Sequence, residues 1–315
     1  MNIVVTGALG HIGSHLIREL PFRYPSATIT LIDNMLTQRY ASLFHLPELG
    51  NYRFLEADVT KMDLDALLDA DSVVIHLAAI TDAAGSFGNA EALEANNFTA
   101  TQRIATACAK SGARLITLSS TSVYGTQSNL VSETASDDEL QPQSPYARTK
   151  LKEEKLVAAL CASDSLRAVT FRFGTIFGES VGMRYHTAVN KFCWQAVMGQ
   201  PITVWSTAYH QKRPYLALSD AVGAICHFIS QDRFDGGVYN VLTHNATVEE
   251  IVDTIRVYVP TLQVGFVDSP IMNQLSYEVD FRKLLATGFT PTGHLRESIG
   301  KSISMLHRAN LAITR

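Results

Sequence analysis

The sequence predicts an α/β fold in which a doubly wound parallel sheet carries helices on both faces. Three observations predict it: short apolar runs, helical segments between them, and a glycine-rich turn directly after the first run. Strands are expected at residues 3–6, 28–32, 53–55, 73–77, 115–118 and 168–173, and helices at residues 14–20, 63–69 and 97–110. Alternation of strand and helix places a parallel sheet between two helical layers.

The N-terminal unit runs from a strand through a turn with Gly7, Gly10 and Gly13 into a helix, which is the order of a Rossmann-type domain. Beyond residue 173 the periodicity changes. A loop extends to His186, a helix follows to about Met198, and later elements are expected at residues 202–205, 219–230 and 238–241. We therefore expect a Rossmann domain over residues 1–173 that also receives segments near 212–241, and a smaller, interleaved substrate-binding region within residues 174–315.

A polar segment over residues 133–144 precedes the helix that starts near Tyr146. It is rich in Ser, Asp and Gln and is closed by Pro142 and Pro145. We expect a loop over the site that can act as a lid.

Composition bounds the class of protein. With 315 residues, 46% of them hydrophobic, the chain can bury a substantial core. The net charge of −4, with both signs spread along the chain, gives neither a basic face for nucleic acid nor a polybasic stretch for a membrane surface. No signal peptide fits before the first apolar run, and the longest apolar stretch, residues 72–80, is too short to span a bilayer, so we expect a cytoplasmic enzyme. Four dispersed cysteines predict reduced thiols and no metal site.

The glycine-rich turn predicts a dinucleotide site. Gly7, Gly10 and Gly13, with His11 and Ile12 between the last two, let the backbone approach a pyrophosphate at the N-terminus of the following helix. We expect His11 to lie near the pyrophosphate and to have no catalytic role.

Acidic residues after the second and third strands extend this prediction. Asp33 follows the second strand, 20 residues after Gly13, where a carboxylate accepts hydrogen bonds from the adenosine ribose. A carboxylate repels a 2′-phosphate, and Asn34 follows instead of an arginine, so the sequence favours NAD over NADP. Asp58 and Val59, after the third strand, suit the adenine amino group.

Tyr146 and Lys150 are the candidate catalytic pair. Residues four apart lie on one face of a helix, so the ammonium can favour the ionised form of the phenol. Such a tyrosine can take a proton from a sugar hydroxyl while Ser120 holds that hydroxyl and the nicotinamide accepts hydride from the carbon. The pattern indicates a dinucleotide-dependent redox site.

These motifs resemble the extended short-chain dehydrogenases/reductases and, more narrowly, the NAD-dependent nucleotide-sugar epimerase/dehydratase family. The resemblance covers nearly the whole chain and extends to residues 76–79, 119–125, 172–178 and 213–220. It implies that Tyr146 is the base, that Lys150 binds the nicotinamide ribose and lowers the tyrosine pKa, and that Ser120 orients a nucleotide-sugar substrate. It also implies a homodimer, paired through the helices expected to begin near Asn97 and Tyr146. Further cofactor-binding residues implied by the resemblance are Leu77, Ala78, Ala79 and Asn97, the last as a structural support.

Departures from the family pattern narrow the reaction. The family's 4,6-dehydratases carry an Asp-Glu pair after the catalytic hydroxyl residue, the decarboxylases a glutamate at the second of these positions, and the 3,5-epimerase-reductases a cysteine at the first. This chain has Thr121 and Ser122 there. What remains is removal and return of hydride at one carbon, with the keto intermediate turned over between the two steps, as in the 4-epimerases.

Candidate substrate-binding residues are Thr121, Thr175, Arg184 and Arg213. Thr175 replaces an asparagine with which relatives hold the nucleotide-sugar phosphates, and Arg213 lies in a matched motif. Arg184 follows the turn where such enzymes begin their substrate pocket, and it is either a partner for a diphosphate or a surface arginine. Arg213 is the stronger candidate for the diphosphate because of its matched motif. His186, in the same segment, is either an additional acid or, as we favour, a histidine at a helix start with no catalytic role.

Three hypotheses remain open. The first is an NAD-dependent nucleotide-sugar epimerase acting at C4 with no net redox change. The second keeps the site but releases reduced cofactor, as a dehydrogenase or ketoreductase of a nucleotide sugar or another secondary alcohol. The third is a non-catalytic NAD sensor, against which the presence of Ser120, Tyr146 and Lys150 argues.

Overall fold

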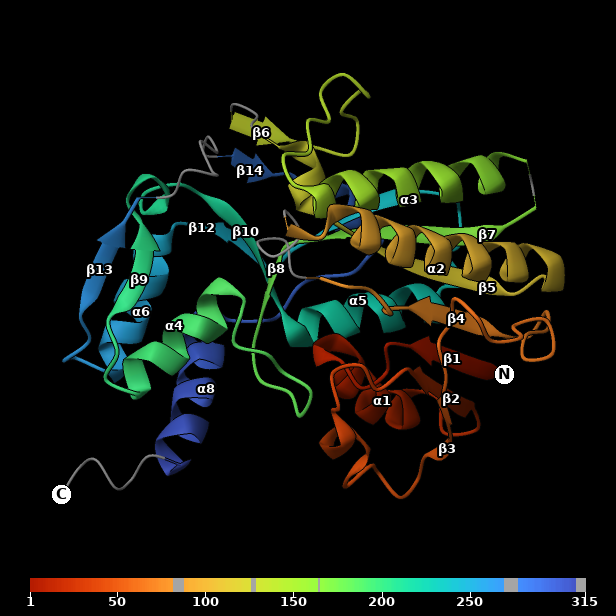
Figure 1. Ribbon diagram of the computed structural model, residues 1–315, viewed down its shortest axis with the longest axis horizontal. Coiled ribbons are helices and arrows are strands. Elements are labelled where there is room, and N and C mark those ends of the chain that lie inside the picture. Colours follow the sequence, from red (N-terminus) through yellow and green to blue (C-terminus); the bar gives the residue numbers. More distant parts are fainter. Residues whose placement is uncertain (82–87, 126–128, 164, 269–276, 310–315) are drawn as a thin grey trace.

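The computed structural model describes residues 1–81, 88–125, 129–163, 165–268 and 277–309, and its centre is a seven-stranded parallel sheet (Figure 1). The strand order is β11-β7-β5-β4-β1-β2-β3. From β1 the chain adds strands first on one side and then on the other, which is the doubly wound order, so the predicted fold class is confirmed. The strands of this sheet are β1 (Asn2–Thr6), β2 (Thr28–Asp33), β3 (Asn51–Glu56), β4 (Val73–His76), β5 (Arg114–Ser120), β7 (Arg167–Phe173) and β11 (Val238–Val241).

Helices cover both faces of the sheet (Figure 1). α1 (His11–Arg23) and α5 (Leu218–Ser230) lie on one face, and α2 (Ala90–Ser111) and α3 (Pro145–Ala162) lie on the other. Side chains alternate along β1: Ile3 and Val5 join the apolar cluster under α1 and α5, whereas Val4 joins the cluster under α2 and α3. A central strand buried on both faces needs apolar residues at nearly every position, which β1 has.

A second apolar cluster forms the smaller region, at the left of Figure 1. It contains α4 (Ala188–Val197), α6 (Val248–Tyr258) and α8 (Leu295–Ala309), packed with the paired strands β9 (Ile202–Trp205) and β13 (Val264–Val267). Between the two regions lies a three-stranded sheet of β8 (Thr175–Phe177), β10 (Arg213–Ala217) and β12 (His244–Ala246). β6 (Asn129–Val131) pairs with β14 (Tyr277–Val279), which the short α7 (Arg282–Leu285) follows. Because β11 returns to the large sheet after β10, the two regions are interleaved.

One predicted helix is wrong. Residues 63–69 form no helix, and only residues 65–67 make a turn, before which the Asp63 carboxylate accepts a hydrogen bond from the backbone N–H of Asp65 at 3.0 Å. Such side-chain-to-backbone bonds compete with helical ones. Leu64 and Leu68 are buried all the same, which explains the helical spacing of apolar residues in this stretch.

Other predicted elements are present with different bounds. α1 begins at His11 instead of residue 14, and α2 begins at Ala90 instead of residue 97. The helix expected up to Met198 is α4, and residues 133–144 are irregular, as expected. Prediction fails mainly at helix starts, because Gly10 before α1 has no side chain with which to cap it and Asn89 before α2 makes no side-chain capping bond.

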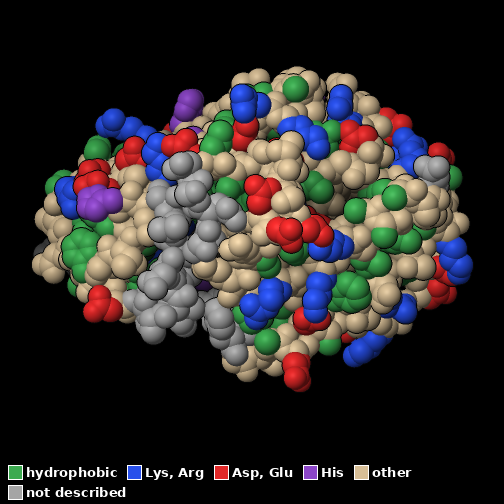
Figure 2. Space-filling model, turned by 90° about the horizontal axis from the view of Figure 1, so that it is seen from above, with side chains coloured by type: hydrophobic (Ala, Val, Ile, Leu, Met, Phe, Trp, Pro, Cys, Tyr) green, Lys and Arg blue, Asp and Glu red, His purple; other side chains and the backbone are tan. Residues whose placement is uncertain are grey.

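Surface charge is mixed. Figure 2 shows Lys and Arg interspersed with Asp and Glu on the face seen from above. Within the described ranges, no helix is both long and apolar enough to cross a membrane, and no group of His, Cys, Asp and Glu is arranged to hold a metal ion. All four cysteines are free thiols, as expected.

Candidate active site

The glycine-rich turn connects β1 to α1 and is shaped by close backbone approach. Gly7 has a φ of +64°, and a Cβ there would lie 2.7 Å from the backbone nitrogen of Ala78. A Cβ on Gly13 would lie 2.4 Å from the Gly7 carbonyl oxygen. Gly10 is the N-cap residue of α1, and it has no side chain that could occupy the N-terminus of the helix. The N–H groups of the first turn, His11 to Gly13, have no acceptor within the helix, so this turn fits a pyrophosphate.

Asp33 ends β2 beside the glycine-rich turn. Its Oδ2 accepts a hydrogen bond from the backbone N–H of Leu9 at 3.1 Å, and its Oδ1 accepts one from that of Met35 at 3.0 Å. These bonds fix the carboxylate and leave lone pairs for the hydroxyls of a ribose. The neighbouring Asn34 side chain accepts from the N–H of Leu36 at 3.1 Å and so stabilises the turn after β2.

Asp58 and Val59 follow β3. The Asp58 Oδ1 accepts hydrogen bonds from the hydroxyl (2.7 Å) and the N–H (2.9 Å) of Thr60, and Oδ2 lies 3.6 Å from Lys61 Nζ. The Thr60 hydroxyl is the main cause of a lowered pKa for Asp58. Val59 is buried, and its carbonyl accepts from Arg103 Nε at 3.2 Å. An ionised carboxylate in this place is a suitable acceptor for an adenine amino group.

The backbone directly after β4 lies beside the glycine-rich turn. The Thr6 hydroxyl accepts hydrogen bonds from the N–H groups of Leu77 and Ala78, each at 3.2 Å. From α2, Asn97 brackets Ile80: its Nδ2 donates to the Ile80 carbonyl at 2.9 Å, and its Oδ1 accepts from the Ile80 N–H at 2.8 Å. Asn97 thus has the geometry of a structural support for the backbone at Ile80, directly after residues 77–79.

Residues 178–184 cross over the glycine-rich turn. The Gly182 N–H donates to Ser14 Oγ at 2.9 Å, and the Gly182 carbonyl accepts from Arg39 Nη1 at 2.7 Å. A Cβ on Gly182 would lie 2.3 Å from the carbonyl oxygen of Leu9. We call residues 178–184 the covering segment, because they lie against the turn that fits the pyrophosphate.

His11 lies under the same segment. Its Nε2 is 3.1 Å from the carbonyl oxygen of Gly178. Burial lowers the pKa of His11 to about 4, so the ring is neutral at pH 7 and can donate to that carbonyl as the Nε2–H tautomer.

α3 presents the candidate catalytic pair. The Ser144 hydroxyl caps the helix by accepting from the Ala147 N–H at 3.1 Å, and Pro145 occupies the first turn. These two residues fix the helix start directly before Tyr146. One turn later, Lys150 places its Nζ 5.9 Å from the centroid of the Tyr146 ring.

Opposing effects act on the Tyr146 phenol. Burial raises its pKa, Lys150 lowers it, Glu153 raises it and Arg184 lowers it, and the net result is a raised pKa. The lowering expected from Lys150 is therefore present but does not outweigh burial. Burial lowers the pKa of Lys150, whereas Glu153, Tyr146 and Glu154 raise it, and the net result is a raised pKa. The Glu153 Oε2 accepts a hydrogen bond from Nζ at 2.8 Å, and the lysine remains an ammonium.

Ser120 ends β5 and begins a single 3-10 turn, η3 (Thr121–Tyr124). Its Oγ accepts hydrogen bonds from the N–H (3.2 Å) and the hydroxyl (2.9 Å) of Ser122, which leaves its own proton for a substrate oxygen. The Thr121 hydroxyl is buried and donates to the Phe173 carbonyl at 3.3 Å. Of these two residues, Ser120 is the better placed to hold a substrate hydroxyl.

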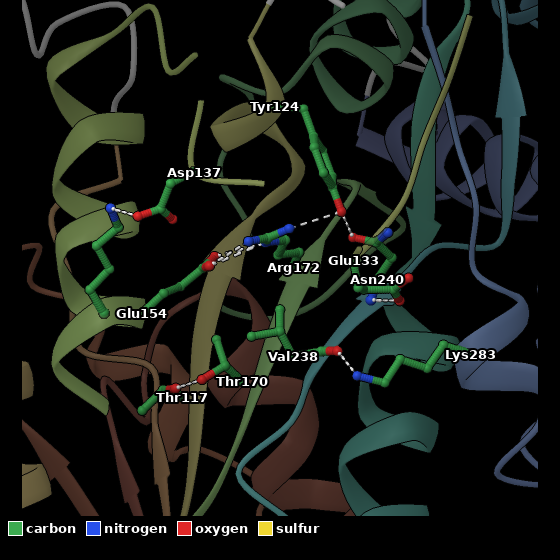
Figure 3. Close-up of polar contacts among 11 residues, drawn as sticks. Thr117, Tyr124, Glu133, Asp137, Glu154, Thr170, Arg172, Val238, Asn240 and Lys283 are labelled. Carbon is green, nitrogen blue, oxygen red and sulfur yellow. Dashed lines mark hydrogen bonds and ion pairs between the residues drawn. The ribbon is translucent and has the colours of Figure 1, made fainter. Parts of the chain in front are cut away.

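A buried polar network ties α3 to the strands (Figure 3). Arg172 of β7 donates from Nε (3.0 Å) and Nη2 (2.7 Å) to the Glu154 carboxylate and from Nη1 to the Tyr124 hydroxyl at 3.0 Å. That hydroxyl donates to Asn240 Oδ1 in β11 at 2.8 Å. The network joins α3, which carries Tyr146, to η3, which directly follows Ser120.

Arg184 lies close enough to Tyr146 to affect its ionisation. Its guanidinium contacts Thr81 Oγ1 and lies 3.4 Å from His186 Nε2. It is also one of the two cations that lower the pKa of Tyr146. Of the two candidate arginines, Arg184 is thus the one that acts on Tyr146, the candidate base.

Arg213 and Thr175 lie together in the three-stranded sheet. β10 pairs with β8 so that Tyr215 is opposite Thr175, two residues beyond Arg213. The Arg213 guanidinium lies 5.2 Å from the centroid of the Tyr277 ring and donates to Gln211 Oε1 at 2.7 Å. Burial lowers the Arg213 pKa.

Sequence reasoning missed Glu153, Arg39 and Gly182. The contact between Arg39 and Gly182 joins residues 143 positions apart, so no local pattern announces it. Glu153 did have a signal, since it is an acidic residue three positions after Lys150 and faces the buried side of α3.

A glycine-rich turn, a carboxylate fixed at the end of the second strand, and Ser, Tyr and Lys side chains on one doubly wound sheet are the features of a nicotinamide-dependent enzyme that acts on a secondary alcohol. The chain belongs to the NAD-dependent epimerase/dehydratase family, whose pattern matches residues 3–241. NAD is accordingly its cofactor, and the fit of the glycine-rich turn and of Asp33 agrees with this.

Several relatives are similar over most of the chain. An uncharacterized UDP-glucose epimerase, YtcB of Bacillus subtilis, is 32% identical over 81% of this chain and 81% of its own. MoeE5, solved in complex with UDP-glucuronic acid and NAD, is 30% identical with a TM-score of 0.84, over 98% of this chain and 100% of that one. The UDP-glucuronic acid 4-epimerase from Bacillus cereus, solved with UDP-glucuronic acid and NAD, is 25% identical with a TM-score of 0.87, over 98% and 100% of the two chains.

Proposed function

We propose that the protein is an NAD-dependent nucleotide-sugar epimerase that acts at C4 through a transient keto sugar. One observation carries the proposal. The chain has Ser120, Tyr146 and Lys150, but at the two positions after Ser120 it has Thr121 and Ser122. Family members that catalyse the other reactions carry Asp, Glu or Cys at these two positions. YtcB and the Bacillus cereus enzyme are epimerases of UDP-sugars by name, and MoeE5 binds UDP-glucuronic acid. These relatives support a UDP-sugar as the substrate.

The catalytic residues have distinct roles in this proposal. Ser120 donates a hydrogen bond to the oxygen on C4 of the sugar and so holds that oxygen in place. Tyr146, as the phenolate, takes the proton of the sugar's C4 hydroxyl and returns it to the same oxygen in the second half of the reaction. Lys150 stabilises the phenolate and binds the nicotinamide ribose. NAD, when bound, supplies the site that accepts and returns the hydride.

The covering segment favours an epimerase over a dehydrogenase. Hydrogen bonds from Gly182 to Ser14 and from Arg39 to Gly182 hold it against the glycine-rich turn. Release of cofactor in every turnover would require breaking these contacts, whereas an epimerase regenerates its cofactor in place. We assign NAD binding to Gly7, Gly10, His11, Ile12, Gly13, Asp33, Asn34, Asp58, Val59, Leu77, Ala78, Ala79, Asn97 and Lys150.

The remaining assignments concern the substrate and the assembly. Residues 1–173, with segments near 212–241, bind NAD in this proposal, and the rest of residues 174–315 binds the nucleotide sugar. Arg184 and Arg213 are the residues that pair with its diphosphate, and Thr121 and Thr175 line the same pocket. We also propose a cytoplasmic homodimer that pairs through α2 and α3, as the family resemblance implies.

Tyr146→Phe tests the role of the proposed base. Removal of the phenol hydroxyl abolishes proton transfer, so turnover of a UDP-sugar substrate should fall by about 10²-fold or more while NAD remains bound. The matched control is Tyr258→Phe, whose hydroxyl donates to the Arg296 carbonyl in the smaller region. Near-normal turnover by Tyr146→Phe would contradict the assignment.

A further inference from the structure

Glu153 lies one turn beyond Lys150 on α3, and the proposed reaction has not used it. Its Oε2 accepts a hydrogen bond from Lys150 Nζ at 2.8 Å, and the two side chains are only 6% and 7% exposed. The same Nζ lies 5.9 Å from the centroid of the Tyr146 ring. Positions i, i+4 and i+7 share one helix face, so phenol, ammonium and carboxylate form a buried series.

The second oxygen of Glu153 sets this carboxylate apart from its neighbour. Oε1 is buried and has no hydrogen-bond partner within the described part of the chain. Glu154 is the contrast, because both of its oxygens accept hydrogen bonds from Arg172, at 2.7 to 3.2 Å. An unpaired buried oxygen is unfavourable for stability. The ion pair of Glu154 with Arg172 satisfies both carboxylate oxygens, as expected of a structural pair. Glu153, in contrast, bonds through Oε2 to the lysine that faces the phenol.

Other charged groups also face this series. Burial, and to a smaller extent the Lys150 charge, lowers the pKa of His76 in β4 to about 3, so this ring is neutral at pH 7. Arg184 acts on Tyr146 from the loop after β8. Glu154 acts on Lys150, but its own charge is matched by the arginine with which it pairs. Glu153 is thus the anion that balances the lysine.

We propose that Glu153 is a positioning residue that acts through Lys150: its carboxylate holds the ammonium beside the Tyr146 ring and offsets the positive charge that the phenol experiences. This role rests on the proposed function, because it concerns the base of that reaction. Lys150 alone would stabilise the phenolate more strongly. With Glu153 present, ionisation of Tyr146 depends more on the other cations at the site, which are Arg184 and the oxidised nicotinamide ring.

Glu153→Gln removes the charge and keeps the shape. In the NAD-loaded protein, the midpoint of Tyr146 ionisation should fall by about one pH unit, because a nearby buried negative charge is lost. The midpoint is measured from tyrosinate absorbance, with the matching Tyr146→Phe protein subtracted in each background. The acid limb of the pH-rate profile for epimerisation should move in the same direction.

Two controls separate charge from structure. Glu153→Asp keeps the charge, so its midpoint should stay near that of the wild type. Asp65→Asn removes an exposed carboxylate that pairs with Lys110, and it should shift nothing. If Glu153→Gln does not fold, Glu153→Ala is titrated instead, with the same direction expected.

The outcomes distinguish this role from the proposed function. A folded Glu153→Gln protein with an unchanged midpoint overturns the role, even if its stability has changed. The titration requires no turnover. A protein that shows the shift but epimerises no nucleotide sugar would refute the proposed function and leave the role of Glu153 standing.

Discussion

Arg172→Met should destabilise the protein strongly, because it leaves Glu154 charged and buried. The substitution removes three hydrogen bonds of 2.7 to 3.2 Å from the carboxylate and one of 3.0 Å from the Tyr124 hydroxyl. Glu154 is 6% exposed and Arg172 is 4% exposed, so water cannot replace these bonds. Loss of one partner of a buried ion pair costs about 3–5 kcal/mol of unfolding free energy.

Urea unfolding at pH 7, with bound NAD held constant, measures this cost. The matched control is the double variant Arg172→Met/Glu154→Met, in which no buried charge remains. It should be more stable than the single variant by about 2 kcal/mol, because replacing both ions is far less costly than orphaning one. A single variant within about 1 kcal/mol of the wild type would refute the reasoning.

Three further predictions concern the cofactor site and acid stability. Gly182→Ala places a Cβ 2.3 Å from the Leu9 carbonyl oxygen, so the covering segment must shift. The Kd for NAD should therefore rise about tenfold, and unchanged retention of NAD in dialysis would contradict this. Asp33→Ser removes the ribose acceptor and the charge that repels a 2′-phosphate, so the ratio of NADP to NAD affinity should rise about tenfold in a binding titration, and an unaltered ratio would count against the Asp33 assignment. Burial lowers the pKa of His11 to about 4 and of His76 to about 3, below the unfolded value of about 6.5. The unfolded chain therefore binds these protons first: stability is complete above pH 6.5 and should fall by about 1.4 kcal/mol per unit per histidine towards pH 4, and a flat profile in urea unfolding would contradict this.

Much of the large sheet and its cofactor turn could be predicted from the sequence, because local rules decide them. A strand buried on both faces must be apolar, and the glycines at positions 7 and 13 have no room for a side chain. The start of α3 could also be predicted, since Pro145 fixes it just before Tyr146.

Contacts between distant segments could not be predicted in this way. The covering segment depends on Arg39 and Gly182, which only the folded chain brings together. Residues 63–69 misled prediction for the opposite reason: Leu64 and Leu68 have the spacing of a helix, but the Asp63 side chain favours a turn. The net effect on the Tyr146 pKa also needs the structure, because burial and Glu153 outweigh the nearby lysine.

The most direct test of the central claim is to mix the purified, NAD-loaded protein with a panel of UDP-, GDP-, CDP- and dTDP-sugars. Products are identified by mass and NMR while absorbance follows free NADH. The proposed function predicts a product of unchanged mass with inverted configuration at C4, most readily from a UDP-sugar, and no NADH in solution. Stoichiometric accumulation of NADH, or no conversion of any sugar in the panel, would contradict it.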